Sequence, residues 1–133
     1  MTHQYSVAVR DARNDAIETV IGNSAKLYIY SGAEPENCAA SDPSGLLATL
    51  SLPSDWIGTS LNGVKAKGAI VWSGIAAVAG VAASYRIKDS TGTTCHIQGS
   101  VGIGTGDLQL DNTNIAIGQT ITISTYQITD GNA

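Results

Sequence analysis

The chain has 133 residues, the length of one domain, and 43% of them are hydrophobic while 14% are charged, against a typical charged share of about 25%. A net charge of −4 and seven scattered Lys and Arg residues exclude the basic stripe of a nucleic-acid-binding protein. Residues 1–13 are mostly polar and do not form an export signal, so we expect synthesis in a cytoplasm.

The first segment, residues 4–10, alternates apolar and polar side chains. Tyr5, Val7 and Val9 share one side, which predicts an extended arm that completes a sheet edge on a partner. A disordered leader is the alternative, since chain termini often fray. We therefore divide the chain into an N-terminal arm (residues 1–9) and a single domain (residues 10–133), and take these three side chains as candidate contacts of a capsid or subunit interface.

An amphipathic helix is predicted over about residues 7–21. Ser6 or Asp11 can cap its start, and Gly22 stands where a left-handed residue ends many helices. Apolar and polar residues recur at helical spacing on opposite sides. The apolar side consists of Val9, Ala12, Ala16, Ile17, Val20 and Ile21, and the polar side of Arg10, Arg13, Asn14, Asp15 and Glu18.

After the helix the apolar period changes to two, as in strands. Seven short segments separated by turn signals predict a mainly β fold: a single antiparallel β-sandwich or jelly-roll-like domain with one N-terminal helix. In the last segment Ile121 and Ile123 differ in parity from Tyr126 and Ile128, which favours a β-bulge near residues 124–125 over a strand covered on both faces. The predicted strands are residues 25–31, 46–52, 64–72, 84–88, 95–101, 108–110 and 119–129.

The most apolar stretch is residues 69–83, which small polar residues and glycines interrupt. It is shorter than the ~20 residues that span a bilayer, so we interpret it as two low-bulk strands around a glycine-containing turn and expect no membrane partner. Its small side chains let another strand layer or another subunit approach closely. Ile75, Val78 and Val81 are its candidate interface residues.

Four glycines between residues 99 and 106 invite comparison with phosphate-binding loops. Their spacing fits neither nucleotide motif, because Asp107 stands where a third glycine is required and no lysine follows Gly104. Both motifs also need a helix after the glycines, whereas residues 107–111 alternate as a strand does. We interpret the segment as a β-hairpin connection whose glycines supply positive φ angles.

Catalytic and metal-binding groups are sparse. Cys95 and His96 are neighbours on a predicted strand and point to opposite faces, so they form no thiolate–imidazole pair, and we expect a buried Cys95 beside an exposed His96. Cytoplasmic synthesis favours a reduced Cys38, with a Cys38–Cys95 disulfide as the alternative. No zinc spacing is present, and Asp107 with Asp111 is interpreted as a solvated edge rather than a calcium site. The sequence predicts a protein that is no enzyme and needs no cofactor or metal.

The chain lacks Phe, and Trp56, Trp72 and five Tyr residues are its large aromatic side chains. A sugar-binding platform is one interpretation of these residues. We favour the other, in which they fill the core of a domain that has no Phe.

Several segments together resemble a family of short tailed-phage and prophage proteins encoded among virion structural genes. The resemblance covers nearly the whole chain, but none of its parts is a chemical motif, so no residue role is carried over. Its signposts are Tyr-Ser-Gly at residues 30–32, Leu-Leu-Ala-Thr-Leu at 46–50, Asp-Ser-Thr-Gly-Thr at 89–93 and the segment from DLQLDN to IAIGQTITI at 107–123.

The resemblance implies a head decoration, or cement, protein, which binds the outside of an icosahedral capsid and stabilises it. The major capsid protein is then the expected partner, and the capsid exterior is the expected location after synthesis in the host cytoplasm. We expect a homo-oligomer, a trimer rather than a dimer. A tail or neck component and a carbohydrate-binding receptor module are the alternative functions.

Overall fold

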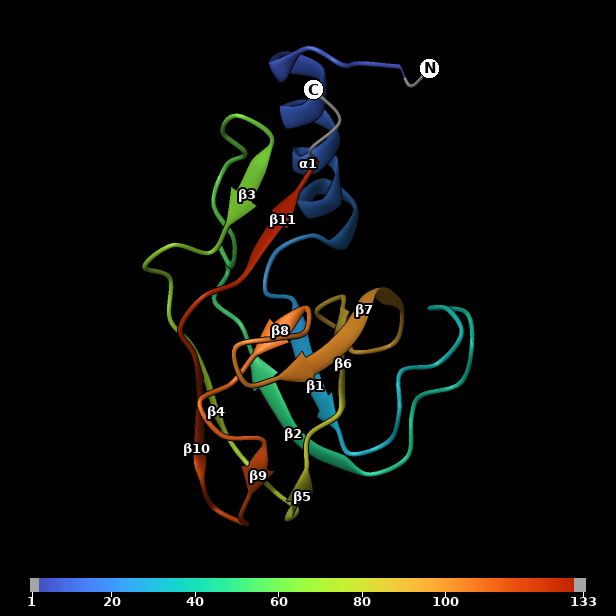
Figure 1. Ribbon diagram of the computed structural model, residues 1–133, viewed down its shortest axis with the longest axis vertical. Coiled ribbons are helices and arrows are strands. Elements are labelled where there is room, and N and C mark those ends of the chain that lie inside the picture. The colour runs from blue at the N-terminus through green and yellow to red at the C-terminus, as the bar shows by residue number, and fades with distance from the viewer. Residues whose placement is uncertain (1–2, 131–133) are drawn as a thin grey trace.

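The computed structural model describes residues 3–130 and is mainly β with one N-terminal helix, which confirms the expected fold class (Figure 1). The helix and the ladder of β3 and β11 lie at one end of the long axis, and β4, β5, β9 and β10 lie toward the other. The elements are α1 (Val7–Ile21), β1 (Lys26–Tyr30), β2 (Leu46–Ser51), β3 (Val64–Ala66), β4 (Trp72–Ile75), β5 (Gly80–Val81), β6 (Ser84–Lys88), β7 (Cys95–Gly102), β8 (Leu108–Gln109), β9 (Asn114–Ile115), β10 (Thr120–Ile123) and β11 (Gln127–Thr129).

The main sheet has five strands in the order β2-β1-β6-β7-β8, and three two-stranded ladders, β10-β4, β11-β3 and β5-β9, complete the fold. The β4 ladder continues from β2 through a bridge between Ala48 and Ala76. A Cβ on Gly74 would lie 2.9 Å from Cγ of Leu50, and this close approach needs a residue without a side chain. The expectation that the low-bulk stretch lets another strand come close is therefore confirmed.

The core lies inside this curled set of strands and is built around aromatic side chains. Trp56 and Trp72 are fully buried, and Tyr85 and Tyr126 nearly so. The Trp72 ring centroid is 6.0 Å from that of Trp56 and 5.2 Å from that of Tyr126. The Tyr85 and Tyr126 hydroxyls share a hydrogen bond of 2.9 Å, so their polar ends are satisfied within the core. The predicted core role is confirmed for both Trp residues and for Tyr30, Tyr85 and Tyr126, whereas Tyr5 is exposed and Tyr28 is half-buried.

Helix α1 has the predicted bounds. The Ser6 hydroxyl accepts from the backbone N–H of Val9 at 3.2 Å, and Gly22 ends the helix with a φ of 85°. The expectation of an extended arm that includes Val7 and Val9 is wrong. Both residues are helical because the Ser6 cap starts the helix directly before Val7.

Two predicted strands are each divided in the structure. The predicted strand 64–72 is β3 followed by β4, with a turn at Gly68, whose φ is 54°. The predicted strand 119–129 is β10, which pairs with β4, followed by β11, which pairs with β3. The change of parity therefore marks the passage between two ladders, and the β-bulge expected near residues 124–125 is wrong.

The glycine-rich segment 99–110 is not a hairpin. Strands β7 and β8 pair in parallel, with Val101 opposite Leu108. The chain turns back sharply through Gly104 and Gly106, whose φ values are 65° and 81°, and the N–H of Leu110 then donates to the carbonyl oxygen of Gly102 at 2.9 Å. A strand, β8, rather than a helix follows the glycines, which agrees with the prediction that the segment is not a nucleotide-binding loop.

Candidate functional site

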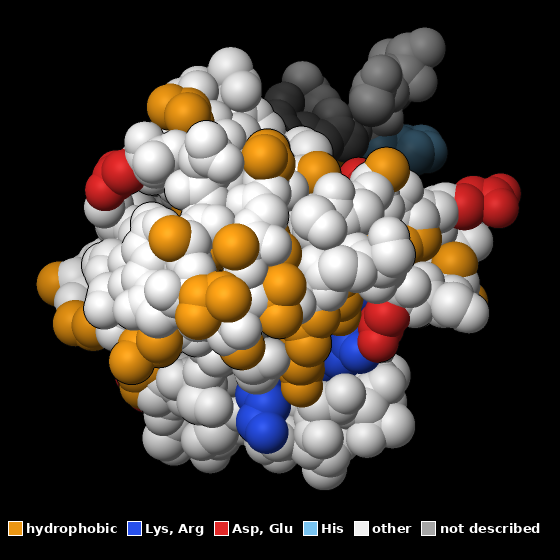
Figure 2. Space-filling view, turned by 90° about the horizontal axis from the view of Figure 1, so that it is seen from below, with side chains coloured by type: hydrophobic (Ala, Val, Ile, Leu, Met, Phe, Trp, Pro, Cys, Tyr) orange, Lys and Arg blue, Asp and Glu red, His pale blue; other side chains and the backbone are white. Residues whose placement is uncertain are grey.

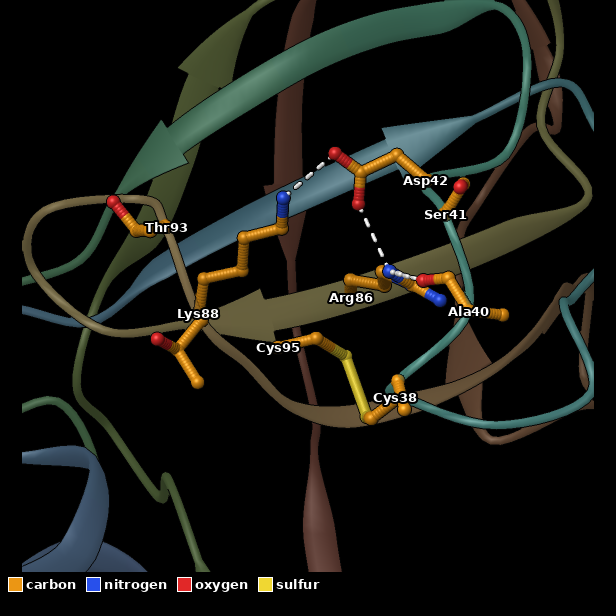
Figure 3. Close-up of a pocket in the computed structure, with 10 residues that line it drawn as sticks. Cys38, Ala40, Ser41, Asp42, Arg86, Lys88, Thr93 and Cys95 are labelled. Carbon is orange, nitrogen blue, oxygen red and sulfur yellow. Dashed lines mark hydrogen bonds and ion pairs between the residues drawn. A yellow bond between two sulfur atoms is a disulfide. The ribbon is translucent and has the colours of Figure 1, made fainter.

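A polar pocket of about 630 Å³ lies between the β1–β2 loop and the β6–β7 turn (Figure 3). Asp42 lies between two cations, accepting from Arg86 Nη1 at 2.9 Å and from Lys88 Nζ at 2.8 Å. The hydrogen bond from Lys88, followed by that from Arg86, holds the pKa of the Asp42 carboxyl below its usual value. Arg86 also donates to the carbonyl oxygens of Ala40 and Asn37, each at 3.1 Å. The cations of this pocket therefore bind the loop itself.

One wall of the pocket is a disulfide between Cys38 and Cys95 (Figure 3). The sequence favoured reduced thiols, and that expectation is corrected because the β1–β2 loop folds over β7 and brings the two Cα atoms to 5.3 Å. Cys95 and His96 are both half-buried, so the expected contrast of a buried Cys95 and an exposed His96 is also wrong. The pocket contains no free thiol nucleophile. We interpret its contacts as an ionic and covalent clamp, that is, as contacts that hold the β1–β2 loop against β6 and β7.

Other sequence candidates for chemistry are explained by local contacts. Asp107 is bound within its own turn, where its Oδ2 accepts from the backbone N–H of Ser100 at 3.1 Å. Within residues 3–130, no group of three or more His, Cys, Asp or Glu residues could hold a metal ion. Trp56 and Trp72 have no exposed ring surface for a sugar platform. No helix in the described part of the chain is long and apolar enough to cross a membrane.

An uncharged surface lies at the end of the molecule opposite α1. Residues 43–54, 68–85 and 112–129 contain no Asp, Glu, Lys or Arg. Parts of these segments meet at that end: the N–H of Ala77 donates to the carbonyl oxygen of Leu47, and the N–H of Gly118 donates to that of Ala76, each at 2.9 Å. Figure 2, which looks onto this end, shows hydrophobic side chains gathered on the surface, with Lys or Arg and Asp or Glu side chains of other segments at their border. We call this surface the uncharged end.

The candidate residues of the low-bulk stretch belong to the uncharged end. Ile75 is 65% exposed, Val81 57% and Val78 47%. Sequence reasoning missed two further members, Ile117, which is 72% exposed, and Leu46, which is 42% exposed. The absence of charged residues over residues 43–54 and 112–129 would have indicated Ile117 and Leu46. A search for apolar runs alone does not detect it.

The N-terminal candidates lie at the opposite end. Tyr5, Val7 and Val9 are 39%, 44% and 43% exposed, respectively. Val20, farther along α1, is 69% exposed, while Arg10 and Asn14 are buried. The predicted amphipathic pattern is present, but the polar side of the helix packs against the protein and most of the apolar side faces solvent.

The polar contacts of α1 are directed at the β3 region. Asn14 Nδ2 donates to the carbonyl oxygen of Gly63 at 2.9 Å, and Lys65 Nζ lies 2.8 Å from carboxylate oxygens of both Asp15 and Glu18. Arg10 Nη1 donates to the carbonyl oxygen of Asp130 at 3.1 Å. These contacts fix the side of the helix that faces inward.

No family model, no curated protein and no solved structure matches the chain. Its function is therefore argued from its own surfaces.

Proposed function

We propose that the chain is a non-enzymatic virion structural protein that binds the outer surface of a phage capsid and stabilises the head, as a decoration or cement protein does. The observation that carries this proposal is the uncharged end, where five large apolar side chains, Leu46, Ile75, Val78, Val81 and Ile117, are exposed. The resemblance of the strand sequences to phage virion proteins supplies the partner, the major capsid protein.

The uncharged end has the properties of a docking surface. The centres of protein interfaces are depleted of charged residues and enriched in apolar ones. Strand β10 is at the edge of its ladder, and residues 112–129 contain neither the charges nor the Pro residues that usually block edge pairing. Because Val7 and Val9 are helical, the strand-like arm is not used for this role, and we assign the capsid contact to the uncharged end.

A tail or neck component is the second candidate, because an uncharged apolar end also suits a partner within the tail. The position of the protein on the particle separates the two functions. Electron cryomicroscopy of particles with and without the protein is expected to show added density over the head shell. Density at the neck or along the tail would overturn the head assignment.

A binding experiment tests the docking surface itself. Purified Ile75→Glu and Ile117→Glu variants are added to capsids that lack the protein, and occupancy is measured by sedimentation. We expect the affinity of each variant for capsids to fall by at least about tenfold. Docking would bury the carboxylate of the new Glu where the wild type buries an apolar side chain. Leu61→Glu is the matched control, since Leu61 is 71% exposed and lies at the helix end of the molecule. Equal binding by all three variants would contradict the proposed contact.

A further inference from the structure

Among the described residues 3–130, the outward face of α1 is an apolar surface that stays exposed. Val9, Ala12, Ala16 and Val20 are all exposed, and on a helix of 3.6 residues per turn their positions form one continuous stripe; Tyr5, which precedes the Ser6 cap and lies outside the helix, is exposed as well. A helix that packs on its own domain normally places such a stripe inward. We call these five residues the helix face.

The helix face cannot turn inward, because the opposite side of α1 is held by charge-assisted hydrogen bonds. Asp11 Oδ1 accepts from the N–H of Gly63 at 2.7 Å and from the Ser60 hydroxyl at 2.8 Å. Lys65, a fully buried side chain, joins Asp15 and Glu18. Rolling the helix would leave these buried groups without partners, at a cost larger than the gain from covering Val9 and Val20.

We propose that the helix face binds the same face of a second copy of this chain, with the two helices parallel. Val9, Ala12, Ala16 and Thr19 are spaced by three, four and three residues, as in the contact seam of a coiled coil, and the small Ala side chains let two helices approach closely. This self-association does not require that the proposed function be correct.

The charges favour the parallel arrangement. Among the outward-facing described residues of α1, Arg13 is the single charged side chain; its Nε lies 3.2 Å from the Asp130 carboxylate, and its guanidinium stacks over the ring of Tyr5. An antiparallel pair centred on the helix face would bring the Arg13 side chains of two copies together. In a parallel pair Arg13 lies beside the small Ala8 of its neighbour, so like charges stay apart.

The parallel arrangement also has a consequence for the whole assembly. Helix α1 runs roughly along the long axis of the molecule, with the uncharged end at the far side (Figure 1). Parallel copies therefore present their uncharged ends in the same direction, whereas antiparallel copies would present them in opposite directions. An assembly built on the helix face can place several uncharged ends on one surface at once.

The first test measures self-association without any capsid. In sedimentation equilibrium, the dissociation constant for self-association of Val9→Glu is expected to be at least tenfold higher than that of the wild type. Val7→Glu is the matched control, because Val7 is 44% exposed, close to the 43% of Val9, and points to the other side of the helix. Two results would overturn the proposal. One is a wild-type chain that is still monomeric at about 100 μM, and the other is an assembly that Val9→Glu leaves intact.

The second test determines helix direction by cross-linking single-cysteine additions, Ala12→Cys and Ala16→Cys, with a short bismaleimide. The native Cys38–Cys95 pair is kept oxidised so that only the new thiol reacts. Parallel helices join like positions, 12 to 12 and 16 to 16, within each variant. Preferential products between mixed Ala12→Cys and Ala16→Cys chains would indicate antiparallel helices and overturn the arrangement. Capsid binding that Ile117→Glu leaves unchanged, with these cross-links intact, would contradict the proposed capsid contact and leave the helix pairing standing.

Discussion

Lys65 joins the helix to the rest of the protein. Its side chain is fully buried, yet Nζ has three partners at 2.8 Å: Asp15, Glu18 and the carbonyl oxygen of Gly58. Burial alone lowers the pKa of a lysine, but the hydrogen bonds that Lys65 donates to the two carboxylates outweigh it and raise the pKa of Lys65 above 10.5. The charge of Lys65 is therefore retained in the folded protein, where it holds α1 against β3.

Replacing this lysine tests how strongly the helix is held. Lys65→Met removes the cation and leaves Asp15 and Glu18 without their partner, so we expect the free energy of unfolding to fall by about 3 kcal/mol. Urea denaturation measures the change. Lys26→Met, at a half-buried lysine of β1, is the control and is expected to change the free energy by less than about 0.5 kcal/mol. A loss as small as that of the control would show that the ion pairs do not stabilise the helix.

The carboxylates of α1 also make stability depend on pH. The hydrogen bond from Lys65 lowers the pKa of Asp15 below 3.8, and the backbone N–H of Gly63 does the same for Asp11. A carboxyl whose pKa is lower in the folded than in the unfolded state stabilises the fold above its unfolded pKa, and this stabilisation is lost as the pH falls through the folded value. We expect the Tm to be level from pH 7 to about 5 and to fall steeply below about 4.

Asp15→Asn provides the comparison for the acid transition. Its Tm is expected to be lower than that of the wild type at pH 7, and the two values are expected to converge as the pH approaches 3. Asp55→Asn, at an exposed position, serves as the control. Parallel Tm curves for the wild type and Asp15→Asn across this range would mean that Asp15 does not contribute to the acid sensitivity.

At the scale of elements, the β1–β2 loop is held by covalent and ionic contacts rather than by a strand. The Cys38–Cys95 disulfide, the Arg86 and Lys88 pairs with Asp42, and the hydrogen bond from Gln98 to Pro35 all fix it to β6 and β7. The double variant Cys38→Ser with Cys95→Ser is expected to keep the fold and to lose about 2–4 kcal/mol of stability.

Limited proteolysis checks whether the loop is freed. Glu34 and Glu36 are exposed on it, so a glutamate-specific protease is expected to cut there faster in the double variant than in the oxidised wild type. Asp42→Asn in the oxidised protein removes both ion pairs and keeps the disulfide, so it separates the ionic from the covalent contribution. Equal cleavage rates in the wild type and the double variant would show that the ionic clamp alone holds the loop.

The sequence predicted those elements whose signals are local. The bounds of α1 follow from Ser6, Gly22 and the apolar period between them, and the core role of Trp56 and Trp72 follows from the lack of Phe. Features set by distant partners were missed. The inward side of α1 depends on Lys65, which is 50 residues from Asp15 in the chain.

Strand pairing was missed for the same physical reason. Hydrogen bonds to β4 and β3 separate β10 from β11, and the parallel register of β8 depends on β7. A period of two is the same in a hairpin strand and in a strand that pairs elsewhere, so the pattern alone does not distinguish them. For the candidate interface, the sequence predicted the apolar run 69–83. Leu46 and Ile117 lie outside that run, and only the fold places them beside it.

At the scale of the whole molecule, the two ends of the long axis differ in charge. The helix end carries the ion pairs of Lys65 and Arg13, while the uncharged end is built from parts of residues 43–54, 68–85 and 112–129, which contain no Asp, Glu, Lys or Arg. A chain of net charge −4 can bring many copies close to a common surface through such an end without concentrating like charges there. This difference is useful for a protein that covers a shell at high copy number.

Docking through the uncharged end predicts that capsid binding is insensitive to salt. Ionic strength screens interactions between exposed charges but leaves the burial of apolar surface nearly unchanged, so the Kd for capsids is expected to differ by less than about threefold between 50 and 500 mM NaCl. Occupancy of capsids measured by sedimentation across this range gives the Kd values. Val9→Glu is expected to weaken binding through lost avidity while keeping the same flat salt dependence. A tenfold or greater weakening of the wild type with salt would place the contact on charged side chains instead, such as those of the helix end or of the β1–β2 loop and β6.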